Sequence, residues 1–356
     1  MHQSRRFAKF SFSTLLWIAA VVLLAGAGTN AGAAPTRDGL QVYFIDVEGG
    51  QSTLFVTPAG ESLLIDTGWP GNNGRDADRI VKAAKLAGLV KLDYVLITHY
   101  HDDHVGGVPQ LVAKFPVMTF IDHGPNRETG DANVVHNFDE YQKVLAGQVK
   151  RLTLKPGDKL PLKGVDATVI SADGALIDKP VNGGGAANEE CATTSKYAAD
   201  TTENSRSLGV LFTFGKLTLL DLGDLTSDKE QELMCPINKL GKVDVYIVSH
   251  HGWYQSSSPL LVDAIAPRVA IMDNGEKKGG SPIVIDTIQA TPGLEHLWQL
   301  HYSDEGGSAH NTMPPYIANL PGPDAGNYLK LTGNQDGSME VFNSRTQATR
   351  HYGPGK

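Results

Sequence analysis

One short stretch of the chain carries an unusual density of side chains that bind metal ions. Residues Thr98–His104 read Thr-His-Tyr-His-Asp-Asp-His and directly follow an apolar run. Just after a strand, a spacing of two points the imidazoles of His99 and His101 the same way, and the next turn brings Asp103 and His104 back toward them. Imidazole nitrogens and carboxylate oxygens suit Zn²⁺, Mn²⁺ or Fe²⁺. The spacing therefore predicts a metal site at the exit of a buried strand.

The segments around this motif alternate between strand and helix patterns. In the first half we expect strands at 40–47, 52–56, 62–65, 92–98 and 117–121, and helices at 77–87 and 110–114. In the second half we expect strands at 167–170, 208–214, 217–220, 243–248 and 269–272, a helix at 259–265, and a hairpin of 328–332 with 339–342. Two similar mixed halves predict an α/β sandwich of two sheets in a single domain.

One segment does not follow this pattern. Residues 173–205 are rich in Gly, Ala, Asn, Thr and Glu and have little periodicity. A loop of this length in a compact domain is usually functional or flexible. Because it ends just before a core strand, we expect an active-site lid or a flexible loop.

The ligand motif resembles that of the metallo-β-lactamase superfamily, in which His-x-His-x-Asp-His follows an apolar strand. Val105-Gly106-Gly107 continues the pattern. Leu63–Gly68 is similar to the family's first motif, Leu219–Asp224 to the motif whose Asp bridges two metals, and Ser249–Gly252 to the final histidine motif. The resemblance implies a four-layer αββα sandwich, here a single domain over 35–356 with a C-terminal hairpin.

Within the family, the chain is most similar to the hydrolase domain of the ComEC-type competence protein and its free-standing relatives. The similarity lies in Phe44–Val47, Gly50–Ser52, Asn204–Leu208 and His250–Pro259. Most members have another histidine just before the strand that begins near Leu208, where this chain has Asn204–Ser207. The resemblance therefore implies that the first metal lacks one protein imidazole. A second departure is Gly280-Ser281-Pro282, where the subgroup tends to have Gly-His-Pro.

The resemblance also implies a role for each matched residue. His99 and His101 would hold the first metal; Asp103, His104 and His250 the second; and Asp224 would bridge them. Asp66 would support the ligand loop, His99–His104, without binding the metal itself. Asp103 would also orient the attacking water, and His251 would face the substrate. The implied cofactor is one or two Zn²⁺, with Mn²⁺ or Fe²⁺ as alternatives.

Three further histidines follow expected strands or lie in loops near the same edge. His123 and His301 each follow a strand, whereas His310 lies in a loop bounded by Gly, Ser and Pro. Each is a candidate for lining the pocket. The alternative for each is a structural or solvated loop position.

The implied chemistry is attack by metal-activated water on a phosphoryl or carbonyl centre. We expect a hydrolase of phosphoesters or phosphodiesters. The alternatives are a lactone or β-lactam hydrolase, an iron-dependent oxidoreductase of the same fold, and a metal-binding protein without catalysis.

Residues 1–34 predict a signal peptide. Arg5 and Arg6 give a basic start, 15–25 is an apolar run, and Ala31-Gly32-Ala33 is a cleavage pattern. The run is shorter than the ~20 residues that span a bilayer, so we expect no membrane anchor after cleavage. The prediction is export to the periplasm or the medium, by the Sec or the twin-arginine route.

The net charge limits the kinds of partner that we expect, and the cysteines bear on the cellular compartment. Removing residues 1–34 leaves 28 basic and 39 acidic residues, a net charge near −11. This charge disfavours avid binding of nucleic acid and favours a small or short anionic substrate held by metal. Two cysteines, Cys191 and Cys235, either form one disulfide or remain free thiols.

Overall fold

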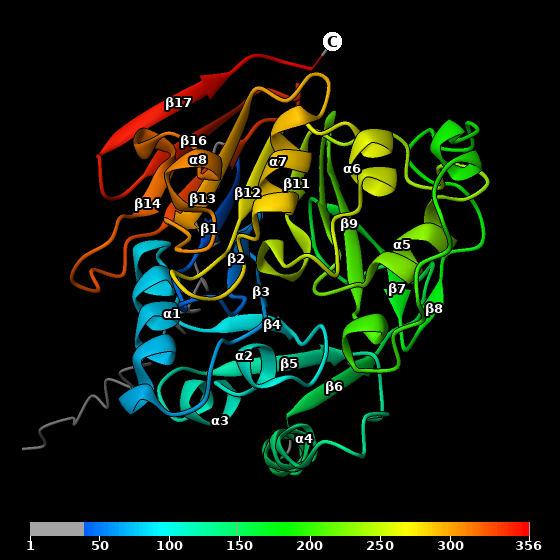
Figure 1. Ribbon diagram of the computed structural model, residues 1–356. Coiled ribbons are helices and arrows are strands. Elements are labelled where there is room, and N and C mark those ends of the chain that lie inside the picture. Colours follow the sequence, from blue (N-terminus) through cyan, green and yellow to red (C-terminus); the bar gives the residue numbers. More distant parts are fainter. Residues whose placement is uncertain (1–38, 148, 356) are drawn as a thin grey trace, which may run out of the picture. The chain divides into compact units, whose positions relative to one another are not determined.

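Runs of β-branched and aromatic residues build two large sheets in the computed structural model, which describes residues 39–147 and 149–355 (Figure 1). The first sheet has the strand order β17-β16-β15-β1-β2-β3-β4-β5-β6. Its strands are β1 (Leu40–Phe44), β2 (Thr53–Val56), β3 (Ser62–Ile65), β4 (Leu92–Leu96), β5 (Val117–Asp122), β6 (Lys150–Thr153), β15 (Leu329–Gly333), β16 (Met339–Asn343) and β17 (Ala348–Tyr352). Pairing is parallel from β3 to β6 and antiparallel across the rest of the sheet.

The second sheet has the strand order β14-β13-β12-β11-β10-β9-β7-β8. Its strands are β7 (Asp166–Ala172), β8 (Ala175–Leu176), β9 (Gly209–Phe214), β10 (Leu217–Asp221), β11 (Val245–Ile247), β12 (Val269–Met272), β13 (His296–His301) and β14 (Ile317–Asn319). Pairing is parallel from β10 to β14. In both sheets a parallel block therefore has its carboxyl ends on one side, where side chains that follow different strands can meet.

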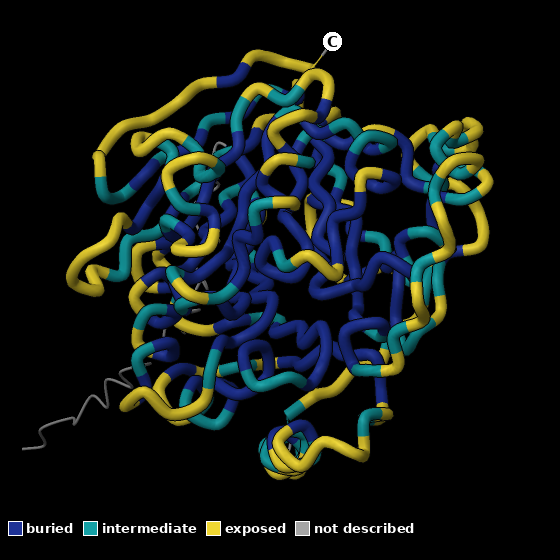
Figure 2. Tube along the Cα trace, in the orientation of Figure 1, coloured by how far each residue is buried: buried dark blue, intermediate teal, exposed yellow. Residues whose placement is uncertain are grey.

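The two sheets pack face to face around an apolar layer. Phe55 of β2 stacks on Phe212 of β9 with ring centroids 4.4 Å apart. Every strand of both sheets except β6, β8 and β17 lies mostly in the buried interior (Figure 2). Burial of this layer supplies the main driving force that holds the sheets together.

Helices cover the outer faces of both sheets (Figure 1). The α-helices are α1 (Arg75–Leu86), α2 (Asp102–Val105), α3 (Val108–Val112), α4 (Ala132–Leu145), α5 (Ser227–Met234), α6 (Pro259–Ile265), α7 (Pro282–Ala290) and α8 (Gly307–His310). Short 3₁₀ turns are η1 (Asn72–Gly74), η2 (Glu189–Ala192), η3 (Asn204–Arg206), η4 (Ser249–Gly252) and η5 (Pro314–Tyr316). Helices α1, α3 and α4 pack on the first sheet, and α5, α6 and α7 pack on the second. The four-layer αββα architecture expected from the resemblance is confirmed.

The C-terminal strands differ from the expectation in one respect. The hairpin of β15 and β16 is present, but it is part of the first sheet, because β15 pairs with β1 from Leu40↔Gly333 to Phe44↔Leu329. A third strand, β17, extends the hairpin. Of the helices in the described part of the chain, none has the length and apolar character needed to cross a membrane. The signal peptide expected at 1–34 lies outside the described residues.

The segment 173–205 is held down along much of its length. A disulfide joins Cys191 to Cys235 in the loop after α5. Backbone hydrogen bonds tie Val181 N to Lys239 O and Gly185 N to Asn238 O, at 2.8 and 2.7 Å. The disulfide and these backbone bonds therefore anchor this part of the segment to the chain after α5, and the flexible loop expected at 173–205 stays a prediction. Closure of any part over a substrate stays a prediction.

Candidate metal centre

The candidate site lies where the carboxyl ends of strands from both sheets meet. Asp66 follows β3, and the residues from His99 to His104 follow β4. From the second sheet, Asp224 follows β10 and the pair His250-His251 follows β11. Five of these side chains lie at least 98% buried: Asp66, His99, His104, Asp224 and His251. The fold thus concentrates ionisable groups in a place that water barely reaches.

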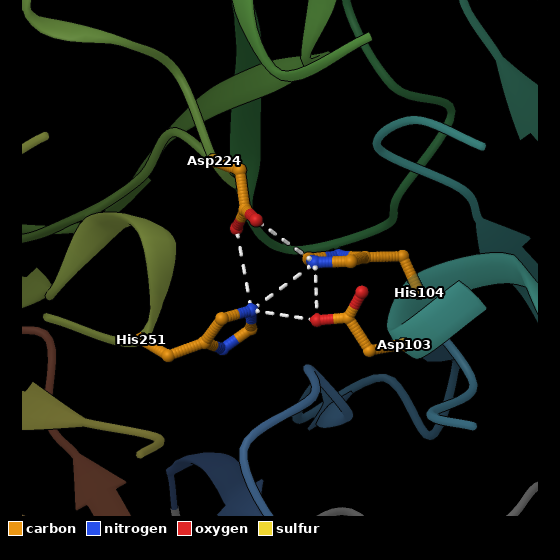
Figure 3. Close-up of side chains that lie close together, drawn as sticks. All are labelled: Asp103, His104, Asp224 and His251. Atoms are coloured by element: carbon orange, nitrogen blue, oxygen red, sulfur yellow. Dashed lines mark hydrogen bonds and ion pairs between the residues drawn. The ribbon is translucent and has the colours of Figure 1, made fainter. Parts of the chain in front are cut away.

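Four side chains form the centre of the site (Figure 3). The ligand atoms of Asp103, His104, Asp224 and His251 all lie within 4.8 Å of one another. His104 Nε2 is 3.2 Å from Asp224 Oδ2, and His251 Nε2 is 3.1 Å from Asp103 Oδ2. The two imidazole nitrogens are 3.2 Å apart. Two nitrogens and two carboxylates that converge in this way are a suitable donor set for one divalent cation.

Two more histidines approach the Asp224 oxygen that His104 also approaches. His250 Nε2 lies 3.5 Å and His99 Nε2 3.8 Å from Asp224 Oδ2. The ring of His101 is next to that of His99, with centroids 4.7 Å apart. Four imidazoles therefore surround the Asp224 carboxylate.

Each imidazole of the ligand loop is oriented by a partner at its second nitrogen. His104 Nδ1 lies 2.7 Å from Asp66 Oδ2, and His99 Nδ1 lies 3.0 Å from Thr98 Oγ1. Thr98 in turn donates its hydroxyl to Asp66, at 2.6 Å. His101 Nε2 lies 2.9 Å from Glu128 Oε2. Such outer contacts fix the tautomer and ring orientation of a metal-binding histidine, so the loop is organised as a ligand loop would be.

The buried carboxyl groups of Asp103 and Asp224 favour the ionised form, so positive charge is needed beside them. Burial works against ionisation of Asp103 and Asp224, but Lys278 beside Asp103 and His104 beside both hold the pKa of each carboxyl well below its usual range. Burial alone would lower the pKa of His251, but Asp224, Asp273 and Asp103 together outweigh it and raise the pKa to about 10. Protons on these imidazoles therefore supply the charge that a metal ion would bring.

Several buried polar atoms at the site have no hydrogen-bond partner among the described residues. Among the described residues, His99 Nε2 and Asp224 Oδ1 have no hydrogen-bond partner although both are buried. A buried polar atom without a partner costs roughly 1–3 kcal/mol, and a metal ion would satisfy both atoms. The residues present therefore fit a metal group with nitrogen and oxygen ligands, as Zn²⁺, Mn²⁺ and Fe²⁺ all accept.

The order of His250 and His251 differs from the expectation. His251, not His250, completes the group with Asp103 and His104, and it is buried rather than directed at a substrate space. The expectation assumed that the first histidine after β11 points to the ligand loop. Both residues instead have left-handed backbone angles, with φ of 55° at each, so the chain turns sharply and delivers the second imidazole to the centre.

The three peripheral histidines lie outside the four-residue centre. His123 is buried and bonded to Glu203 at 2.9 Å. His301 is buried and bonded to Asp46 at 2.7 Å. His310 is exposed enough to pair with Asp286 on the surface, at 2.7 Å. Each has a carboxylate partner of its own, and a pocket role for any of them stays a prediction.

Several residues that shape the site were not anticipated. Lys278 contacts Asp103 Oδ2 and lies over the Trp69 ring, 4.8 Å from its centroid. Asp273, which follows β12, lies 3.4 Å from His251 Nδ1. Glu128 orients His101, as described above. All are far in sequence from the histidines they serve, and the only available signal was that Asp273 directly follows an expected strand.

Comparison with known proteins agrees with this geometry. Residues 46–169 match the family model of the metallo-β-lactamase superfamily. Recombination protein 2 of Haemophilus influenzae is 26% identical over 237 residues, which cover 66% of this chain and 24% of that protein. Hydroxyacylglutathione hydrolase of Aliivibrio fischeri is 40% identical over 78 residues, 20% of this chain and 30% of that enzyme. The chain thus spans a third or less of the length of these relatives.

Among solved structures, the metallo-β-lactamase fold protein YhfI of Bacillus subtilis aligns with a TM-score of 0.44 at 16% identity, over 73% of this chain and 96% of that one. The family-model match contains Asp66 and the whole ligand loop, and the relative from Haemophilus extends the similarity to two thirds of the chain. Over residues 46–169, which hold the ligand loop, the chain thus matches the metallo-β-lactamase superfamily.

Proposed function

We propose that this chain is an exported metal-dependent hydrolase, with Zn²⁺ as its metal and a phosphoester or phosphodiester as its substrate. The observation that carries the proposal is the convergence of buried imidazoles on the Asp224 carboxylate. A single structural histidine is common in proteins, but a group of four around one carboxylate has no comparable structural purpose. His99, His101, Asp103, His104, Asp224, His250 and His251 would hold the metals.

Bound divalent ions lower the pKa of water from 15.7 toward ~7 and polarise the bond to be cleaved. The chain's own residues contribute orientation and charge. Asp66 and Glu128 hold the rings of His104 and His101, so little reorganisation is needed when the site is used. Lys278, about one third exposed, is a cation next to Asp103 that can receive an anionic group of the substrate.

Two observations favour a phosphoester. The first is the cation Lys278 beside the centre, whose ammonium group lies over the face of the Trp69 ring in a cation–π contact. The second is the extent of similarity, since the competence-type motifs run well beyond the ligand loop and the relative from Haemophilus covers 66% of the chain. The acidic balance of the chain after residue 34 favours a small or short substrate over long nucleic acid.

A thioester is the second candidate substrate. It is supported by the hydroxyacylglutathione hydrolase of Aliivibrio fischeri, whose identity of 40% is higher but is confined to 20% of this chain. Lactone or β-lactam hydrolysis, iron-dependent oxidation and metal binding without turnover remain as outcomes of the same test.

The proposal of export rests on the pattern of residues 1–34 and on the disulfide. Disulfides persist in oxidising compartments such as the bacterial periplasm and the medium, and Cys191 and Cys235 are bonded. Cell fractionation and N-terminal sequencing test the proposal. A chain that starts at residue 1 and stays in the cytosol would contradict it.

A metal-reconstituted activity screen of the full chain tests the function. The substrates are bis(p-nitrophenyl) phosphate, p-nitrophenyl phosphate, a thioester of glutathione, a lactone and a chromogenic cephalosporin, each with Zn²⁺, Mn²⁺ or Fe²⁺. We expect the phosphodiester to be hydrolysed fastest, and His99→Ala together with His101→Ala to abolish turnover. Activity confined to the last three substrates would overturn the phosphoester proposal, and oxygen uptake with Fe²⁺ would indicate redox chemistry.

A further inference from the structure

The sequence lacks the histidine that is expected just before β9. In the structure another imidazole, that of His250, lies near this position. The family's usual histidine before β9 is replaced here by the segment Asn204–Ser207, and Asn204 lies in η3, next to that strand. The side chain that approaches Asn204 is His250, whose Nε2 is 3.4 Å from Asn204 Nδ2. We infer that His250 takes the place of the missing histidine, so that His99, His101 and His250 hold the first metal and His251 belongs to the second. This inference rests on the metal binding in the proposed function, but not on any particular substrate.

The distances around Asp224 separate the two neighbouring histidines. His250 Nε2 approaches Oδ2, the oxygen that His99 Nε2 and His104 Nε2 also approach, at 3.5, 3.8 and 3.2 Å. His251 Nε2 instead lies 3.5 Å from Oδ1 and 3.1 Å from Asp103. The rings of the two neighbours are 6.2 Å apart and inclined by 73°. Adjacent residues thus approach different oxygens of one carboxylate, and only His251 also contacts Asp103.

The second nitrogen of His250 is engaged as expected of a ligand. Its Nδ1 lies 3.2 Å from Ser256 Oγ, which leaves Nε2 directed at the site. The same arrangement is found at His99 with Thr98 and at His104 with Asp66. An outer hydrogen bond of this kind fixes which nitrogen is available to a metal.

The backbone at His250 and His251 has a left-handed conformation, which is strained for residues other than glycine. His250 and His251 both have φ of 55°, which costs of the order of 1–3 kcal/mol per residue outside glycine. Two hydrogen bonds hold the turn: His250 N donates to Gly223 O at 3.0 Å, and Trp253 N donates to His250 O at 2.7 Å. The fold therefore maintains strain that positions both imidazoles.

A purely structural role for His250 would require Asn204 to be its real partner. The contact between them is at the long end for a hydrogen bond, at 3.4 Å. Asn204 Oδ1 is itself buried and has no hydrogen-bond partner among the described residues. The pair therefore does not satisfy its own polar groups, whereas a metal at His250 Nε2 would.

Metal titration of the full chain tests the inference without using turnover. Chelator-treated protein is titrated with Zn²⁺ against a competing chelator, and with Co²⁺ to follow its absorption spectrum. We expect two equivalents in the unmodified chain. His250→Ala should lower the affinity of one site by at least a hundredfold and change the other by less than threefold. His351→Ala, at an exposed position on β17, is the matched control and should change neither.

Double variants identify which site is lost. If His250 and His99 share a metal, the combination His99→Ala with His250→Ala should still bind one equivalent. His99→Ala with His251→Ala should bind none with comparable affinity. Retention of both metals in His250→Ala, or loss of both in the first combination, would overturn the inference. His250→Gln replaces the alanine variant if the latter fails to fold.

A rescue variant tests the exchange of positions. Asn204→His in the His250→Ala background should recover at least tenfold of the lost affinity, and no recovery would count against a shared position. These outcomes are separable from the proposed function. Two metals bound as described without turnover on any substrate would refute the hydrolase and leave His250 as a ligand.

Discussion

Asp221 is a buried carboxyl whose titration should control how stability changes with pH. It ends β10 with 2% of its surface exposed. Its Oδ1 accepts a hydrogen bond from Gly223 N at 3.0 Å, and its Oδ2 accepts one from Gln51 Nε2 at 2.7 Å. Burial outweighs these bonds and, with the nearby charge of Asp273, raises the pKa to about 7 from 3.8.

The sign and size of the effect follow from proton linkage. Because the folded chain holds a proton that the unfolded chain releases near pH 4, the contribution of Asp221 to stability is largest below pH 4 and falls as the pH rises to about 7. A shift of roughly three units at 1.36 kcal/mol each gives a loss of about 4 kcal/mol. Asp221→Asn removes this titration and keeps an acceptor for Gly223 N, but its Nδ2 replaces the oxygen that accepts from Gln51 Nε2. The loss of that bond affects the variant at every pH, so its stability relative to the unmodified chain should rise by about 4 kcal/mol from pH 4 to pH 8.5.

Urea unfolding of chelator-treated protein from pH 4 to 8.5 measures this difference. Asp166→Asn is the matched control, because Asp166 is 58% exposed and its ion pair with Lys159 is on the surface. An exposed pair contributes at most about 1 kcal/mol, so the control should run parallel to the unmodified chain. If the Asp221→Asn curve also runs parallel, Asp221 is ionised in the folded chain and the reasoning from burial is wrong.

Four further predictions test the site and the scaffold. Glu128→Ala should weaken the first metal about 10–100-fold and leave the second unchanged in Zn²⁺ titrations, because His101 loses its orienting partner; equal loss at both sites would refute this. Replacing Cys191 and Cys235 by Ser should lower the free energy of unfolding in urea by about 2–4 kcal/mol, since the disulfide closes a loop over 44 positions; no change in the presence of oxidant would contradict it. Phe55→Ala should cost about 3–5 kcal/mol in the same assay, whereas a loss below 1 kcal/mol would mean that the layer between the sheets refills the space. Chelation should lower the melting temperature, with each metal at a thousandfold excess over its Kd contributing about 4 kcal/mol; calorimetry showing no shift would argue against a resident metal.

Much of the scaffold was predictable because its signals are local. The runs that became β3, β10, β12 and helix α6 were placed to within about a residue, since alternation and turn residues mark them directly. Helices α4, α5 and α7 were not expected. Helix α4 is capped by Asp131, whose side chain accepts from Asn133 N at 2.7 Å, and its Val134, Phe138, Tyr141 and Leu145 follow a helical spacing, so a local signal for it was present and was missed. The joining of β15 to β1 depends on pairing between residues almost 300 positions apart, which no local pattern contains.

Spacing alone predicts the site only where its residues are contiguous, and Asp66, Asp224 and His250 were expected only from the resemblance to a family. His99, His101, Asp103 and His104 lie within six positions, and their order after one strand is sufficient to indicate a metal site. Lys278 and Glu128 enter from loops whose composition is ordinary. Their roles depend on which strand ends become neighbours in space, and that is determined by the packing of the sheets.

The two histidines after β11 show where reasoning from chain order fails. In a regular strand adjacent side chains point to opposite faces, so one of two neighbours should face a site and the other should not. His250 and His251 are not in a strand: consecutive left-handed angles, held by the bond from His250 N to Gly223 O, turn both rings toward Asp224. Left-handed angles outside glycine are imposed by tertiary contacts, so the sequence contains no direct sign of them. Chain order could not choose between the two residues because the turn brings both rings to Asp224, His250 to Oδ2 and His251 to Oδ1.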